Sequence, residues 1–127
     1  MGIKTFLAYY TAEYFKLSEF ECKCGCGLGA ETNNTIDVIY APLIVALDLM
    51  RTRIGKPIIV NSGWRCHYWN EKKRGSPNSL HMSGNAADIT CSDYPALWGQ
   101  SDICKLFGLE IIRYDQQRFI HVQKSRR

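Results

Sequence analysis

The segment from Ser79 to Asp88 constrains this chain most, because it holds a histidine and an aspartate separated by a glycine. If residues 86–90 form a strand, Ala86 and Asp88 face one side of it. The turn allowed by Gly84 can then bring His81 back toward Asp88. Imidazole nitrogen and carboxylate oxygen are both zinc ligands, and a catalytic zinc site usually takes three protein ligands. The segment therefore predicts two thirds of such a site.

A third candidate ligand, His121, lies near the end of the chain between apolar residues, as in a buried strand. Residues 109–114 and 119–122 predict a hairpin around the turn at 115–118. Antiparallel pairing of this hairpin with the strand at 86–90 would bring His121 beside Asp88. Spacing alone does not establish the site, because most histidines and aspartates are surface or hydrogen-bonded residues.

The remaining elements place a helix before the sheet. Apolar residues at helical spacing from Ile36 to Met50 predict an amphipathic helix that reaches Arg53, with Pro42 near its start and Gly55 after its end. We also expect a strand at 57–61, a short helix at 67–73 and a helix at 95–107. This order favours an α+β fold.

Length and charge set broad limits. At 127 residues, the chain is expected to form one domain over residues 1–127. Its net charge of +4 mildly favours an acidic partner. Nucleic acid is not the expected partner, because no recognition-helix or aromatic-sheet signature accompanies the charge. The apolar run at 6–10 is too short for a signal-peptide core or a membrane span, so we expect no membrane partner.

Six cysteines are present, and three of them are crowded into the run Cys22, Cys24 and Cys26. Neighbours this close do not readily pair with one another. Structural zinc sites usually place about two to four residues between ligands and use a second ligand pair elsewhere. Small buried thiols at a turn are therefore the favoured interpretation, with a metal site as the alternative. A disulfide from this run to Cys66 stays open.

Several motifs, in order, resemble the M15 zinc D-alanyl-D-alanine peptidase family. They are Ser62-Gly63-Trp64-Arg65, Asn70, Ser79-x-His81-x-x-Gly84-x-Ala86-x-Asp88 and Phe119-x-His121-Val122. The resemblance covers about residues 17–123 and is closest to short carboxypeptidase-like proteins of bacteria and phages. It implies a small antiparallel sheet with helices packed on one side, a zinc fold shared with hedgehog domains.

The resemblance also implies roles for individual residues. His81, Asp88 and His121 would hold one Zn²⁺ ion, while Arg65 and Ser79 would line the substrate cleft. A guanidinium at Arg65 can bind a peptide carboxylate in a bidentate pair or stabilise a developing oxyanion.

The resemblance does not extend to the general base. Family members commonly carry an acidic residue three positions before the last histidine or two after it, where this chain has Arg118 and Gln123. Asp115, at the mouth of the hairpin, is the best candidate base, although an aspartate that starts a turn explains it equally well. Glu110 is a weaker candidate.

Other residues near these motifs could have either a functional or a purely structural role. His67 could contact substrate, although a surface histidine on a short helix is favoured. The aromatic residues Trp64, Tyr68 and Trp69 could line a groove, although core packing explains most of them.

The leading functional hypothesis is a zinc peptidase that cuts peptidoglycan stem peptides, as a D,D-carboxypeptidase or a phage endolysin-type endopeptidase. The alternative is a zinc-containing, catalytically weak module that binds cell wall or serves in a virion, motivated by Arg118 and Gln123 at the base positions. We expect a monomer, made in the bacterial host cytoplasm from a bacterial or phage gene, that acts at the cell wall or periplasm.

Overall fold

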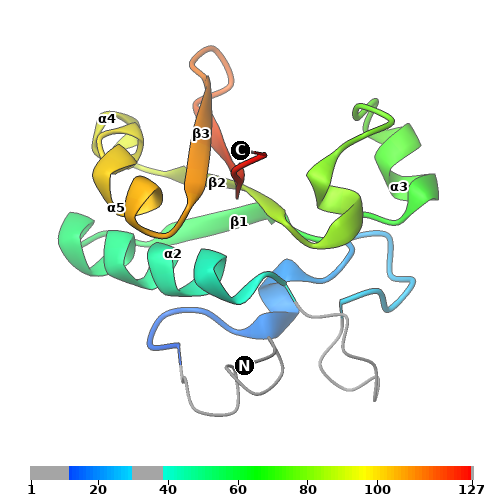
Figure 1. The fold of residues 1–127 in the computed structure, drawn as a ribbon, viewed down its shortest axis with the longest axis horizontal. Coiled ribbons are helices and arrows are strands. Elements are labelled where there is room, and N and C mark those ends of the chain that lie inside the picture. Colours follow the sequence, from blue (N-terminus) through cyan, green and yellow to red (C-terminus); the bar gives the residue numbers. More distant parts are fainter. Residues whose placement is uncertain (1–11, 30–38, 127) are drawn as a thin grey trace.

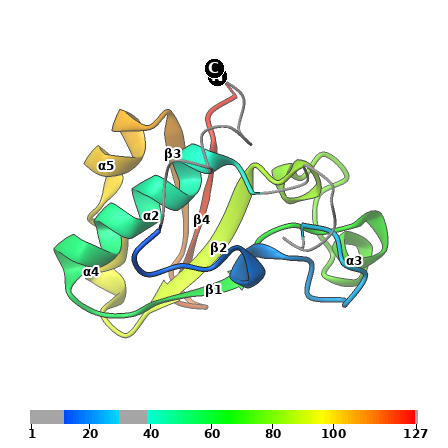
Figure 2. The same ribbon diagram turned by 90° about the horizontal axis from the view of Figure 1, so that it is seen from below.

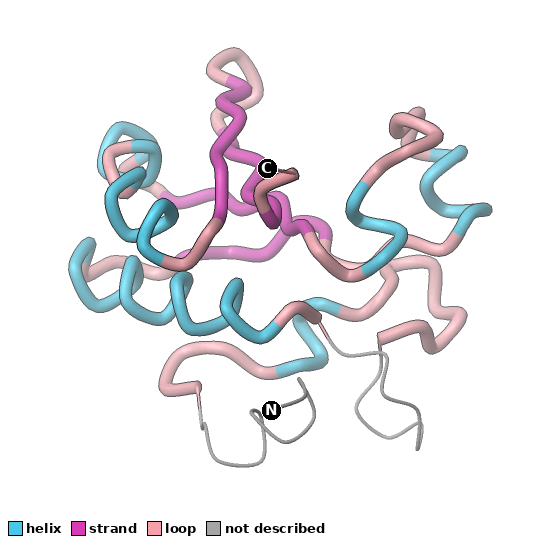
Figure 3. Tube along the Cα trace, viewed as in Figure 1, coloured by secondary structure: helices cyan, strands magenta, loops and turns pink. Residues whose placement is uncertain are grey.

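A four-stranded antiparallel sheet in the order β1-β2-β4-β3 lies at the centre of the structure, a computed structural model that describes residues 12–29 and 39–126 (Figure 1). The strands are β1 (Ile58–Ser62), β2 (Ala86–Cys91), β3 (Leu109–Tyr114) and β4 (Phe119–Lys124). The helices are α2 (Ala41–Ile54), α3 (His67–Lys72), α4 (Tyr94–Trp98) and α5 (Ser101–Leu106), with 3-10 turns η1 (Leu17–Phe20) and η2 (Leu80–Ser83). The small antiparallel sheet together with the helices gives the expected α+β fold (Figure 3).

Helix α2 packs along one side of the sheet (Figure 2). Its first turn contains Pro42, whose fixed φ suits a helix start. Gly55 ends it in the left-handed conformation at φ 74°, and its N–H donates to the Arg51 carbonyl. Leu43 and Leu47 are fully buried, and replacing either by alanine would cost about 2–5 kcal/mol. The earlier start expected at Ile36, and the apolar run at 6–10, lie outside the described residues.

The single helix expected at 95–107 is wrong, because the structure has two short helices there, α4 and α5. Asp93 caps α4 by accepting a hydrogen bond from the Ala96 N–H at 3.2 Å. The break follows at Gly99, a residue of low helix propensity. Leu97 on α4 and Cys104 on α5 both belong to the core.

The sheet separates an apolar face from a polar one. Ala87 and Ile89 of β2, with Ile120 and Val122 of β4, belong to the core formed with α2, α4 and α5. Because side chains alternate along a strand, Asp88 and His121 face the other side, away from this core. No helix in the described part of the chain is long and apolar enough to cross a membrane.

Candidate metal centre

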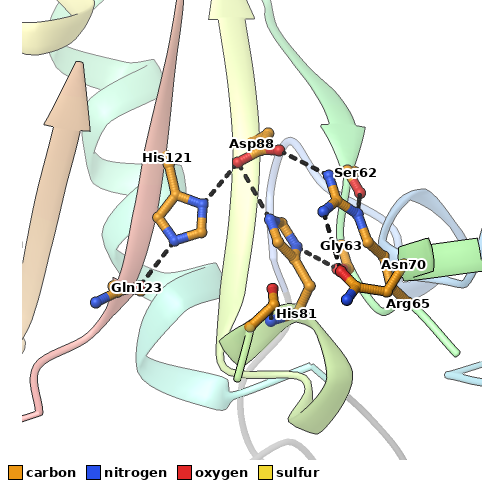
Figure 4. Close-up of polar contacts among 9 residues, drawn as sticks. Ser62, Gly63, Arg65, Asn70, His81, Asp88, His121 and Gln123 are labelled. Atoms are coloured by element: carbon orange, nitrogen blue, oxygen red, sulfur yellow. Dashed lines mark hydrogen bonds and ion pairs between the residues drawn. The ribbon is translucent and has the colours of Figure 1, made fainter. Parts of the chain in front are cut away.

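Three elements bring His81, Asp88 and His121 together on the polar face of the sheet (Figure 4). Asp88 of β2 is the register partner of His121 of β4, so the expected antiparallel pairing is present. His81 comes from η2, which precedes β2 and turns into it through Gly84 at φ 74°. One candidate ligand atom from each residue lies within 4.8 Å of the others. We call these three residues the cleft centre.

The His81 ring is oriented by its surroundings. Its Nδ1–H donates to the Gly63 carbonyl at 2.7 Å, and a carbonyl can only accept, so a neutral ring carries its lone pair on Nε2. That Nε2 is buried, lies 3.2 Å from Asp88 Oδ1, and has no hydrogen-bond partner among the described residues. Ser79 supports this arrangement, because its hydroxyl caps η2 by accepting from the His81 N–H at 3.2 Å.

A chain of polar groups fixes the His121 ring in the same way. Gln123 Nε2 donates to Glu110 Oε1 at 2.7 Å, and an ionised carboxylate only accepts, so the amide oxygen must face His121. The Nε2–H of His121 donates to that oxygen at 2.8 Å. The lone pair of a neutral ring then lies on Nδ1, which is 2.8 Å from Asp88 Oδ1. Partners of this kind commonly orient histidine ligands to metals.

The two imidazole lone pairs therefore converge on one carboxylate oxygen. Neutral rings in these tautomers place no proton between nitrogen and oxygen, so the two lone pairs and the carboxylate oxygen repel one another. A cation among the three atoms would relieve this repulsion. Two imidazoles and a carboxylate are the ligand set of several zinc sites. The residues of the cleft centre thus fit Zn²⁺, and the orphaned Nε2 of His81 is the clearest sign.

Asp88 is held as a carboxylate. Burial alone would raise the pKa of Asp88, but protonated rings of His121 and His81, donating to it, outweigh burial and hold that pKa well below its ordinary value. With neutral rings, a bound cation would supply the same positive charge beside the carboxylate. Arg65 binds the other carboxylate oxygen, with Nη2 donating to Asp88 Oδ2 at 3.1 Å. Arg65 is itself held by Ser62, whose hydroxyl accepts from Nε at 2.9 Å. Arg65 therefore positions a ligand as well as lining the cleft.

The cleft centre lies at a cleft of about 380 Å³ between the segment that follows α3 and the β3–β4 hairpin. Its basic lining residues are Arg65, Lys73, Arg74 and Arg126, while Asp88 is the one acidic residue that lines it among those described. Ser79 also lines the cleft, as expected. No sequence pattern predicted the other three cations, because only the fold brings residues 73, 74 and 126 to one rim.

The structure does not bring Asp115 to the cleft centre. Its Oδ1 accepts from the Tyr94 hydroxyl at 2.7 Å, and both carboxylate oxygens accept from Arg113. The hydrogen bond from Tyr94, and then Arg113, lower the pKa of Asp115, which weakens it as a base. Arg118 also points elsewhere, with its guanidinium over the Tyr94 ring. Neither residue lines the cleft.

The structure favours a structural role over substrate contact for the aromatic residues and the histidine around α3. Trp64 is buried in the core, in close contact with Gly29 and Gly84. His67 and Tyr68 are exposed on α3 and do not line the cleft. Trp69 is half-buried and lies beneath the Lys73 ammonium. The ligand set and the basic cleft, not these aromatic rings, define the site.

Three converging ligand residues beside an open cleft have the form of a catalytic metal centre, which leaves a coordination position for substrate or water. The comparison with known families agrees. A family model described as Peptidase M15 matches residues 13–123, so the chain belongs to the peptidase M15 family, whose members are zinc-dependent metallopeptidases. No curated protein matches the chain.

Proposed function

We propose that this chain is a zinc peptidase that hydrolyses peptidoglycan stem peptides. The observation that carries the proposal is the cleft centre itself, with two imidazole lone pairs and one carboxylate converging beside a basic cleft. His81 through Nε2, Asp88 through its carboxylate and His121 through Nδ1 would hold the ion. Bound Zn²⁺ would polarise a scissile carbonyl and lower the pKa of water to about 7, which yields hydroxide without a strong general base.

The charge of the cleft supports a substrate that carries a carboxylate. Lys73, Arg74 and Arg126 face the cleft, and Asp88 is the one described acid there. Stem peptides end in a carboxylate, which a guanidinium can bind through two parallel hydrogen bonds. Arg65 is engaged by Asp88 and Ser62, and Arg126 donates to the Asn78 carbonyl, so Arg74 and Lys73 are the better candidates for this contact.

The cleft contains no free carboxylate in its described lining to accept the proton of water. Gln123 lines the cleft at one of the usual base positions, but its amide is occupied by His121 and Glu110. Glu110 does not itself line the cleft. We therefore expect hydrolysis without a strong general base, and this same feature favours the alternative function, a zinc-bearing module that binds cell wall.

The test is release of products from purified peptidoglycan and from a synthetic stem peptide that ends in D-alanyl-D-alanine. Metal-free protein, protein with added Zn²⁺, and the variants His121→Ala and His67→Ala are compared by mass spectrometry. His67 is a matched control because it is exposed and does not line the cleft. Free D-alanine would indicate a carboxypeptidase, and internal fragments an endopeptidase.

Zinc-dependent release that is lost in His121→Ala and kept in His67→Ala is the expected result. Zinc binding without release from any wall type would overturn the peptidase proposal. Co-sedimentation of the intact protein with insoluble peptidoglycan would in that case support the binding module.

A further inference from the structure

Four cysteines form a second group of metal-ligating side chains, away from the cleft. Cys22, Cys24 and Cys26 lie on the loop after η1, and Cys66 directly precedes α3. Their sulfur atoms all lie within 4.8 Å of one another. The Cys22 and Cys24 sulfurs are 3.5 Å apart, and those of Cys24 and Cys66 are 3.6 Å apart. We call these residues the four-thiol cluster.

Core packing does not explain the four-thiol cluster. Cys91 and Cys104 are buried in the core, as expected of free cysteines that act as small apolar residues. Within the cluster, by contrast, Cys26 is exposed and Cys24 is only half-buried. All six cysteines lie in the described ranges and are free, so no disulfide holds the cluster together.

The spacing of the sulfurs suits a tetrahedral metal ion. Zinc–sulfur bonds of about 2.3 Å in a tetrahedron place the sulfurs about 3.8 Å from one another. The sulfur–sulfur distances of 3.5 and 3.6 Å are close to this edge, whereas a disulfide would need about 2.05 Å. We propose that Cys22, Cys24, Cys26 and Cys66 hold a structural Zn²⁺ ion, separate from the ion of the cleft centre.

The backbone around the cluster favours thiolates. The Cys66 N–H donates to the Cys22 sulfur and the Trp69 N–H donates to the Cys66 sulfur, each at 3.4 Å. Such bonds to metal-bound sulfur stabilise its negative charge. Between Cys24 and Cys26, Gly25 adopts a left-handed conformation at φ 86°, which lets a run with single-residue spacing fold back on itself.

Zinc is the metal that this ligand set favours. Soft thiolates in a tetrahedral set of four select zinc or iron, and a closed set of four protein ligands is typical of structural rather than catalytic zinc. The half-buried and exposed members of the cluster leave a path by which the ion can enter.

The ion would bind the loop after η1 to the segment that contains Arg65 and Cys66, and Arg65 lines the cleft. The Trp64 N–H donates to the Phe20 carbonyl at 2.8 Å, and Gly63 packs so closely on Phe20 that an added Cβ would lie 2.5 Å from its carbonyl oxygen. Cys66 directly follows Arg65, which binds Asp88. An ion bound by the cluster would therefore join the loop after η1 to Cys66, next to the contact of Gly63 with Phe20 and next to Arg65.

The test combines metal analysis with spectroscopy on the full chain. By elemental mass spectrometry we expect about two zinc equivalents in the wild type, about one in Cys24→Ser/Cys66→Ser, and about one in His81→Ala/His121→Ala. Cys91→Ser is the matched control and should keep both. With Co²⁺ in place of Zn²⁺, the histidine double variant should show intense thiolate-to-cobalt charge-transfer absorption, which Cys24→Ser/Cys66→Ser should lack.

The cobalt spectrum of the wild type tests the same point without any substitution. Absence of the charge-transfer absorption, or an intact mass that shows disulfides among these cysteines in freshly prepared protein, would overturn the proposal. Iron in place of zinc would overturn the choice of metal. Because each site has its own double variant, loss of the zinc of the cleft centre would leave this result unaffected.

Discussion

The cleft centre and the four-thiol cluster are built from different ligands and lie in different surroundings. His81, Asp88 and His121 supply two nitrogens and a carboxylate beside an open cleft, with hydrogen bonds that fix each ring. The cluster supplies four sulfurs, three from the loop after η1 and one from Cys66 directly before α3. Three protein ligands leave a position for chemistry, whereas four sulfurs leave none. Ligand number and access, more than the choice of metal, therefore separate a catalytic role from a structural one.

The largest expected effect is the loss of hydrolysis when a substitution disrupts the cleft centre alone. Asp88→Asn keeps the size of the side chain and removes the charge that the two histidines share, so we expect hydrolysis of a stem peptide to fall by about 1,000-fold or more. Asp102→Asn is the control, since Asp102 and its partner Arg53 are exposed and do not line the cleft. Measurement of kcat/KM checks the effect, and near-normal activity in Asp88→Asn would contradict the assigned ligand.

The next effect concerns stability and isolates the four-thiol cluster. In the Asp88→Asn background, zinc at a thousandfold excess over its Kd should stabilise the fold by about 4 kcal/mol through the remaining site. Thermal unfolding with a strong chelator, and after zinc is restored, measures this difference. A midpoint that does not respond to zinc in this background would leave the cluster without a structural role.

A smaller effect comes from the groups that orient His121. Gln123→Leu removes the acceptor that holds the proton on Nε2, and we expect zinc affinity at the cleft centre to fall by about 10–100-fold. Gln116→Leu, in the exposed hairpin turn, is the matched control. Competition with a zinc chelator, read in the Cys24→Ser/Cys66→Ser background, reports this site alone. Equal affinity in both variants would show that Gln123 does not orient the ring.

The smallest effect is expected at Asp115. Its carboxylate is bound by Tyr94 and Arg113 outside the cleft, so Asp115→Ala should change hydrolysis by less than about twofold. Stem-peptide release measured beside the wild type checks this. A collapse of activity at unchanged zinc content would restore Asp115 as the base.

Local patterns in the sequence were enough to predict most elements and the three ligand candidates. The turn at Gly84 and the alternation of β2 predicted the common side of Ala86 and Asp88, and antiparallel pairing supplied His121. Two helices in place of one at 95–107 were missed, because helical spacing does not show where a glycine will interrupt it.

Two other contacts between distant segments could not be predicted from the sequence. The orientation of the Gln123 amide depends on Glu110, which pairs with it only across β3 and β4. The sequence left open a disulfide from the cysteine run to Cys66, but the structure brings Cys66 beside the run as a free thiol, next to the contact of Trp64 and Gly63 with Phe20. Spacing within the run of three cysteines contains no sign of this contact.

Diffraction from crystals grown with zinc, recorded on both sides of the zinc absorption edge, would show directly whether His81, Asp88 and His121 bind zinc. We expect an anomalous peak bonded to His81 Nε2, the Asp88 carboxylate and His121 Nδ1, beside the cleft. An empty cleft centre in crystals that contain zinc elsewhere, or a zinc ion in the cleft bound by other residues, would contradict it.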